Sequence, residues 1–208
     1  MAELRAIQLI ILLFSVIVHE VMHGWVAKKF GDTTAERAGR LTLNPIPHID
    51  LVGTILLPFL SIYLGGILFG WAKPVPVNPL NFSNLRKGEL MVSAAGIAAN
   101  FGLAITAALI FRILDSLPQA FPPLLGGALI FTVLINLVLG LFNLLPIPPL
   151  DGSKILLSQL PYKLAREYQK IESYGFLLLL ILLFTGMLGF VFNIARLIAG
   201  ILLGTGSF

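Results

Sequence analysis

The chain contains the segment His19-Glu20-Val21-Met22-His23, in which two histidines and a glutamate form the pattern H-E-x-x-H. On a helix, residues four positions apart share a face, so the imidazoles of His19 and His23 can bind one metal ion. Glu20 lies about 100° further round the helix. There its carboxylate can hold and deprotonate a metal-bound water. This spacing predicts hydrolytic chemistry at a zinc ion.

The composition indicates where this chemistry takes place. The chain has 208 residues, of which 57% are hydrophobic and 12% are charged, and its mean hydropathy is +0.95. Soluble domains carry about 25% charged residues. Several apolar runs approach or exceed the roughly 20 residues that span a bilayer as a helix. We therefore expect an all-α polytopic membrane protein that forms one integral-membrane domain over residues 1–208.

The third metal ligand must come from a short list of residues. Cysteine is absent, so only His, Asp, Glu or water can bind the metal. Hydrolytic zinc sites usually have three protein ligands and one open position. Asp151 is the best candidate, because it follows an apolar helix that prolines break, although it could instead cap the stretch that follows. The remaining histidine, His48, is either a polar loop residue or a residue near the cavity mouth that binds substrate or zinc transiently.

Four apolar segments and a C-terminal segment make up the expected architecture. Membrane helices are predicted at residues 5–30, 89–111 and 124–145, and residues 51–70 form an apolar segment that Gly and Pro interrupt. Together they would form a three-helix core over residues 5–154. The C-terminal segment, 174–204, could be one long tilted helix or a hairpin broken near Gly186 and Gly189. No loop is long enough for a PDZ domain.

Residues 71–79 alternate proline and valine, which predicts an extended edge strand. Such an edge could pair with an unwound substrate segment by strand addition. The alternative interpretation is a stiff surface loop.

The segment 51–70 decides whether the motifs can meet. If it crosses the membrane, the H-E-x-x-H motif and Asp151 leave the membrane on opposite faces; if it is re-entrant, they leave on the same face. With Arg196 set aside, the re-entrant topology places eleven Lys and Arg on one face and two on the other, whereas the spanning topology gives eight and five. The positive-inside rule favours the re-entrant topology and places the motifs near the cytoplasmic face, in what we expect to be the plasma membrane of a prokaryote.

Three separated motifs together resemble the site-2 protease family of intramembrane zinc metalloproteases. They are His19-Glu20-x-x-His23, Gly96-x-x-x-Asn100 and Asn143-x-x-Pro146-x-Pro148-x-Leu150-Asp151-Gly152. The resemblance covers residues 16–154 and is that of a short bacterial or archaeal-type member without a PDZ or CBS domain. One departure is Ile97, where many members have proline.

The resemblance implies roles for individual residues. One Zn²⁺ ion would be bound by His19, His23 and Asp151, with Glu20 as the catalytic acid and base. Asn143 would hold the substrate or polarise the scissile carbonyl, and Asn100 would bind substrate in a similar way.

The leading hypothesis is an intramembrane zinc endopeptidase that cuts transmembrane helices of other membrane proteins. Its partners would be the substrate helix and the lipid bilayer. The net charge of +4 reflects membrane topology and not nucleic-acid binding. Two alternatives stay open: a catalytically inactive relative that binds membrane helices, and a metal-linked transporter, because broken segments and buried polar residues also mark substrate pathways.

Overall fold

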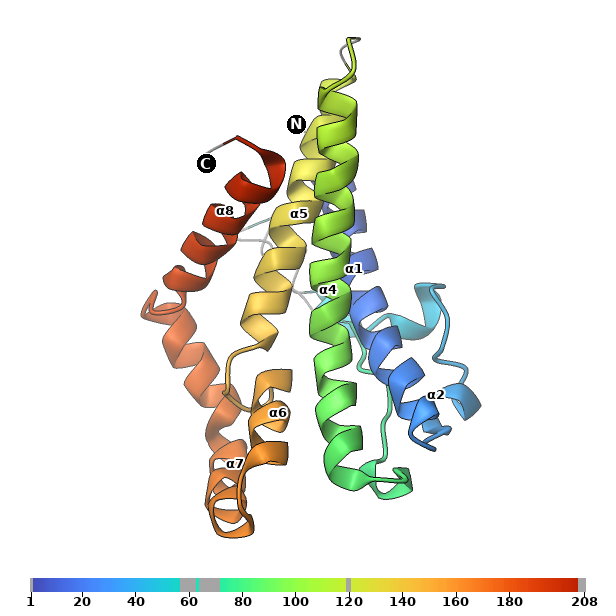
Figure 1. The fold of residues 1–208 in the computed structure, drawn as a ribbon, viewed down its shortest axis with the longest axis vertical. Helices are drawn as coiled ribbons and strands as arrows, with labels where there is room; N and C mark the ends of the chain where they lie inside the picture. The colour runs from blue at the N-terminus through green and yellow to red at the C-terminus, as the bar shows by residue number, and fades with distance from the viewer. Residues whose placement is uncertain (1, 57–62, 64–71, 119–120, 206–208) are drawn as a thin grey trace.

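The protein is helical and contains no strand in the residues that the computed structural model describes, which are 2–56, 63, 72–118 and 121–205. This architecture confirms the predicted all-helical membrane class (Figure 1). The helices are α1 (Ala2–Lys29), α2 (Thr34–Arg37), α4 (Leu85–Asp115), α5 (Pro123–Asn143), α6 (Asp151–Gln159), α7 (Tyr162–Phe184) and α8 (Gly189–Leu203), with short helical turns η1 (Ile46–His48), η2 (Leu51–Leu56) and η3 (Pro79–Asn81).

Three helices, α1, α4 and α5, are long and apolar enough to cross a membrane. They correspond to the three predicted membrane helices. Large apolar side chains on their outer faces are exposed, among them Ile10 and Leu109, as expected for contact with lipid. Helix α4 begins four residues before its predicted start, because the Asn84 side chain accepts a hydrogen bond from the Lys87 N–H and caps the helix. The chain is an integral membrane protein.

Helices α1 and α5 run in the same direction and α4 runs in the opposite direction (Figure 1). Small residues on α4 allow its neighbours to approach closely. Ala104, Ala107 and Ala108 are buried in one cluster with residues of α5 and α8. The C-terminal ends of α1 and α5 therefore lie toward the same end of the bundle, which is the arrangement that the convergence of the motifs requires.

The ends of the segment between α1 and α4 also lie together. The Ser83 N–H donates to the Phe30 carbonyl at 2.8 Å, and the Lys73 N–H donates to the His48 carbonyl at 2.9 Å. A single membrane crossing by residues 51–70 would separate His48 from Lys73 by the thickness of the bilayer. The contact between His48 and Lys73 therefore agrees with the predicted re-entrant topology and not with the spanning one. The path of residues 57–62 and 64–71 lies outside the described residues.

Residues 72–78, which we call the strap, form neither a helix nor a strand, so the prediction of an edge strand is wrong here. Proline has no N–H, which removes two of the donors that a strand would need. The N–H groups of Lys73, Val75 and Asn78 donate to the His48 carbonyl and to the carboxylates of Glu20 and Asp32, and not to a neighbouring strand. Because Val75 is buried, the strap is not a plain surface loop either.

The C-terminal segment consists of two helices, α7 and α8, bent by 71° where they join. Gly186 allows the break, since its φ of 72° lies in the left-handed region that favours glycine. The segment is thus neither one straight helix nor a tight hairpin. Helix α8 packs in the core cluster with α4 and α5, and α7 contacts the proline turn before α6. The Tyr168 hydroxyl donates to the Pro146 carbonyl at 2.9 Å, and a Cβ at Gly175 would collide with the Pro148 carbonyl.

Candidate metal centre

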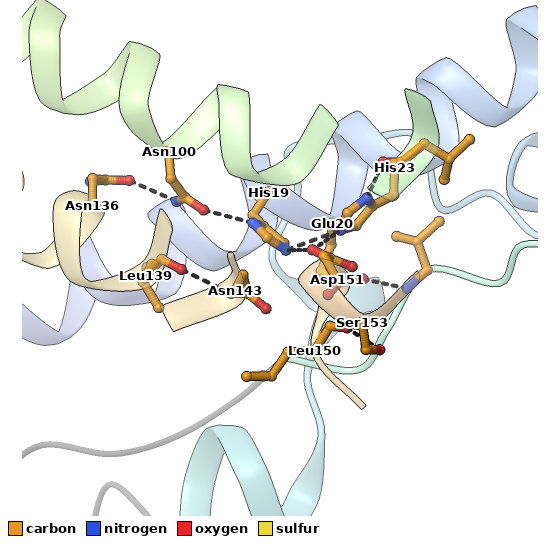
Figure 2. Close-up of polar contacts among 12 residues, drawn as sticks. His19, Glu20, His23, Asn100, Asn136, Leu139, Asn143, Leu150, Asp151 and Ser153 are labelled. Carbon is orange, nitrogen blue, oxygen red and sulfur yellow. Dashed lines mark hydrogen bonds and ion pairs between the residues drawn. The ribbon is translucent and has the colours of Figure 1, made fainter. Parts of the chain in front are cut away.

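Three side chains that the sequence predicts as metal ligands converge between α1 and α6 (Figure 2). The Nε2 atoms of His19 and His23 are 3.0 Å apart. The Asp151 Oδ2 atom lies 3.1 Å from the first and 3.2 Å from the second. All three side chains are buried. The structure therefore brings two imidazoles and one carboxylate to a single point.

A glycine on α4 makes room for both imidazoles. A Cβ atom at Gly96 would lie 2.6 Å from Cε1 of His19 and 2.6 Å from Cε1 of His23. Real Cβ atoms essentially never approach carbon atoms so closely. The glycine of the motif Gly96-x-x-x-Asn100 is therefore explained by the packing of α1 against α4.

A second glycine directs Asp151 into the centre. Helix α5 ends at Asn143 and α6 begins at Asp151, and a Cβ at Gly152 would collide with the carbonyl groups of Leu144 and Leu145. The turn between the helices can fold this tightly only with glycine there. Leu150 is the N-cap residue of α6 and no side chain caps this helix, so the alternative of Asp151 as a cap is wrong.

The protonation of His23 follows from its backbone partner. Its Nδ1 lies 2.7 Å from the Val92 carbonyl oxygen. A carbonyl only accepts hydrogen bonds, so Nδ1 carries the proton and donates. In the neutral ring, Nε2 then has a free lone pair that points at the centre.

The protonation of His19 follows from a buried chain of polar side chains (Figure 2). The Asn136 Nδ2 atom donates to the Thr132 carbonyl at 2.9 Å and to the Ser15 hydroxyl at 2.8 Å. Asn136 Oδ1 is thus left to accept from Asn100 Nδ2 at 2.9 Å, and Asn100 Oδ1 faces His19 Nδ1 at 2.6 Å. His19 therefore donates from Nδ1, and its Nε2 also carries a free lone pair.

The three donor atoms fit a bound zinc ion. With both Nδ1 atoms protonated, no proton lies between the two Nε2 atoms and Asp151 Oδ2, and that buried oxygen has no hydrogen-bond partner. Such a group of acceptors is unfavourable unless a cation lies among them. Zinc binds His nitrogen and carboxylate oxygen at about 2.0–2.2 Å, which separates tetrahedral ligands by about 3.4 Å, close to the distances observed.

Glu20 lies beside the centre and contacts the strap. Its Oε2 atom accepts a hydrogen bond from the Val75 N–H at 2.7 Å. The side chain is half-buried. No further hydrogen bond of this carboxylate is found among the described residues, so its second oxygen is available to water.

Three further residues considered as site residues, Asn100, Asn143 and His48, are not members of the metal group. The fully buried Asn100 amide contacts His19 through its oxygen and Asn136 through its nitrogen, and its predicted role in substrate binding stays a prediction. Asn143 is the last residue of α5, where its Nδ2 donates to the Leu139 carbonyl at 3.0 Å. His48 is fully buried and lies outside the metal group; its Nε2 is 2.9 Å from the Thr42 carbonyl.

Ser15 and Asn136 belong to the site but were not predicted from the sequence. Both are almost inaccessible to solvent, with exposed fractions of 1% and 0%. The available signal was the cost of polar side chains at membrane depth, which usually indicates a partner or a function.

Comparison with known proteins identifies the family. Residues 124–185 match the sequence pattern described as Peptidase family M50. The chain is 41% identical over 186 residues to the "Putative zinc metalloprotease YwhC" of Bacillus subtilis, covering 88% of this chain and 82% of that protein. This chain belongs to peptidase family M50. The expected resemblance to the site-2 proteases, which form this family, is confirmed.

Two relatives of lower identity are also similar. The "Putative zinc metalloprotease Rip2" of Mycolicibacterium smegmatis is 33% identical over 178 residues, which cover 83% of this chain and 64% of that protein. The "Zinc metalloprotease MJ0392" of Methanocaldococcus jannaschii is 28% identical over 186 residues, 88% of this chain and 43% of that protein. No solved structure matches the chain. Membership makes this chain a peptidase, and its three converging donors give it the ligand set of a zinc enzyme.

Proposed function

We propose that this protein is an intramembrane zinc endopeptidase that hydrolyses peptide bonds in or near transmembrane helices of other membrane proteins. The observation that carries the proposal is the position of the metal centre. His19 and His23 lie within α1, a helix long and apolar enough to span the bilayer, and two further helices of this kind, α4 and α5, pack beside it. A hydrolytic centre in such a bundle is suited to substrates that are themselves embedded in the membrane.

The residues of this chain have separate tasks in the proposed reaction. His19, His23 and Asp151 would hold the zinc ion, which when bound makes a water acidic enough to ionise near neutral pH and polarises a carbonyl group. Glu20 takes the proton of the attacking water and later gives it to the leaving amine. The water oxygen bonds to the carbonyl carbon, the C–N bond breaks, and the proton that Glu20 carried completes the amine.

The surrounding amides act on the ligands and on the substrate. Asn100 and Asn136 orient the His19 ring, since hydrogen bonds to the far nitrogen of a metal-binding histidine fix its tautomer and direction. One hydrogen of the Asn143 Nδ2 group remains after the bond to the Leu139 carbonyl. We assign that hydrogen to the carbonyl oxygen of the scissile bond.

The distribution of basic residues supports a cytoplasmic orientation of the centre. Lys28 and Lys29 end α1, and Arg86 and Lys87 begin α4, at the end of the bundle where both helices meet. Cytoplasmic loops carry an excess of Lys and Arg. We place the protein in the plasma membrane of a prokaryote, with the metal centre toward the cytoplasmic side.

The test is a cleavage screen with purified protein in liposomes. Wild type and Glu20→Gln would be mixed with a pool of single-span membrane proteins, and new peptide termini would be identified by mass spectrometry. Wild type should cleave within or beside some of the helices, while Glu20→Gln should retain zinc but cleave at least a hundredfold more slowly, as expected for loss of a general base. Glu36→Gln changes an exposed carboxylate on α2 and should cleave like wild type.

Two outcomes would overturn the proposal. Cleavage of the pool by Glu20→Gln at the wild-type rate would remove the assigned mechanism. Zinc-loaded wild type that captures helices without cutting any of them would identify an inactive helix-binding relative, and zinc uptake into the liposomes would identify a transporter.

A further inference from the structure

The strap lies against α1 on the same face as Glu20. Gly24 follows Glu20 by one helical turn, and a Cβ at Gly24 would lie 2.8 Å from Cγ1 of Val75. Val75 itself is buried, with an exposed fraction of 7%. Its side chain thus packs on α1 while its N–H donates to Glu20 Oε2 at 2.7 Å. The main chain of the strap is in direct contact with the proposed catalytic carboxylate.

Contacts on both sides of Val75 hold the strap in place. The Arg40 Nη2 atom donates to the Lys73 carbonyl at 2.6 Å, and the Lys73 N–H donates to the His48 carbonyl at 2.9 Å. At the other end, the Asn78 N–H donates to Asp32 Oδ2 at 2.7 Å. The prolines within the strap fix their own φ angles. The Val75 N–H therefore has little freedom to leave its position.

Arg40 is a buried cation without an acidic partner. Its exposed fraction is 7%, it forms no ion pair among the described residues, and its Nε has no hydrogen-bond partner. Burying a charge without an acidic partner costs free energy. The hydrogen bonds that the guanidinium does form must therefore offset part of this cost. Besides the Lys73 carbonyl, the guanidinium contacts the Pro74 carbonyl at 3.3 Å.

One peptide unit therefore lies between Arg40 and Glu20. The carbonyl of Pro74 and the N–H of Val75 belong to the same planar peptide group and point in opposite directions. Arg40 contacts the carbonyl end and Glu20 contacts the N–H end, so the positive and negative charges lie at the two ends of one peptide dipole. Polarisation of a hydrogen-bonded chain strengthens its bonds in surroundings of low dielectric constant.

We propose that the Pro74–Val75 peptide, polarised by Arg40, is a positioning group that aims the Glu20 carboxylate; this inference rests on the proposed function. The N–H fixes Oε2 and leaves Oε1 directed at the attacking water. Arg40 is accordingly a positioning residue and not a catalytic one. Both contacts are made by main-chain atoms of the strap.

The alternation of proline and valine supplies a matched pair of variants. Val75→Pro deletes the N–H that donates to Glu20, whereas Val77→Pro makes the same change at a position whose N–H has no hydrogen bond among the described residues. We expect Val75→Pro to lower kcat for a helix cleaved in the screen by about 10–100-fold, with KM and zinc content unchanged, because small misplacements of reacting groups reduce rates by such factors. Val77→Pro should retain the wild-type kcat.

Three further variants test the inference if Val75→Pro fails to fold. Replacing residue 75 by the hydroxy-acid analogue of valine exchanges the N–H for an ester oxygen and keeps the side chain; it should lower kcat as Val75→Pro does. Arg40→Met should also lower kcat, and Arg40→Lys, which keeps the charge and a donor, should restore part of it. Equal kcat values for the ester variant and wild type would overturn the inference, as would equal loss in Val77→Pro.

An infrared measurement separates this inference from the proposed function. In protein labelled with ¹³C-glutamate, subtraction of the Glu20→Gln spectrum isolates the carboxylate stretch of Glu20. This band should shift in Val75→Pro and stay in place in Val77→Pro, whether or not any substrate is cut. A wild type that cuts nothing contradicts the proposed function alone, whereas an unshifted band contradicts the positioning of Glu20.

Discussion

Gly96→Ala should weaken zinc binding by moving both histidine ligands at once. The added Cβ would lie 2.6 Å from the Cε1 atoms of His19 and His23 and 2.6 Å from His23 Nε2. Carbon atoms in contact are ordinarily about 3.5 Å apart, so each ring must retreat by about 0.9 Å. Helix α4 cannot move away from the two rings, because it packs against α1, α5 and α8.

The size of the effect follows from the tolerance of zinc sites. Ligand distances in such sites vary by about 0.2 Å, which is several times less than the displacement that Gly96→Ala imposes. We expect zinc affinity to fall about 100-fold or more, because disturbing only the groups that support the ligands already costs 10–100-fold. The helix itself should not suffer, since alanine is about 1 kcal/mol more favourable than glycine in a helix interior.

The assay is competition for zinc between the purified protein and a chromophoric chelator, with cleavage of a reporter helix measured at the same zinc concentrations. Gly102→Ala is the control, because it makes the same change on the same helix where no atom lies within 4 Å of the new Cβ. It should bind zinc like wild type. If Gly96→Ala binds zinc as tightly as Gly102→Ala, the explanation of Gly96 by ligand packing is wrong.

Three other outcomes are expected. Asn136→Leu should weaken zinc binding about tenfold, whereas Thr132→Val keeps the carbonyl that orients Asn136 and should not; equal affinities would contradict the polar chain. Burial alone would raise the pKa of Asp32. Hydrogen bonds from Thr34 and Asn81 lower it by more than burial raises it, so the pKa lies below its ordinary value. The ionised Asp32 carboxylate stabilises the fold at neutral pH, and this contribution is lost as pH falls through the lowered pKa. The difference in melting temperature between wild type and Asp32→Asn should therefore shrink below about pH 4. A difference that stays constant with pH would contradict this. Chelation of zinc should abolish cleavage and added zinc should restore it; cleavage that survives full chelation would exclude a zinc mechanism.

The local part of the site could be predicted from the sequence. The four-residue spacing of His19 and His23 fixes their shared helix face. The distribution of Lys and Arg favours a re-entrant segment at residues 51–70, which lets both histidines meet Asp151. Both results depend on helix periodicity and charge, which are properties of short segments.

The long-range part could not be predicted in this way. The contact between Asn100 and His19 joins residues 81 positions apart, and nothing in the local pattern specifies it. The extended conformation of the strap follows from its prolines, but the acceptor for the Val75 N–H is chosen by the packing of the strap on α1. Helix α7 begins at Tyr162, whereas the predicted C-terminal segment began at residue 174. The residues between are rich in Lys, Arg and Glu, which are good helix formers, so their polar composition does not end the helix.

The contacts of α7 with the proline turn affect how far the protein can be shortened. The motifs end at Gly152, yet Tyr168 and Gly175 touch carbonyl groups of the turn that leads to Asp151. Cutting the chain after α6 would remove the hydrogen-bond donor of the Pro146 carbonyl and free the backbone that carries the third ligand. The smallest unit that keeps a high-affinity metal centre should therefore include α7, although that helix contributes none of the three donors of the metal group.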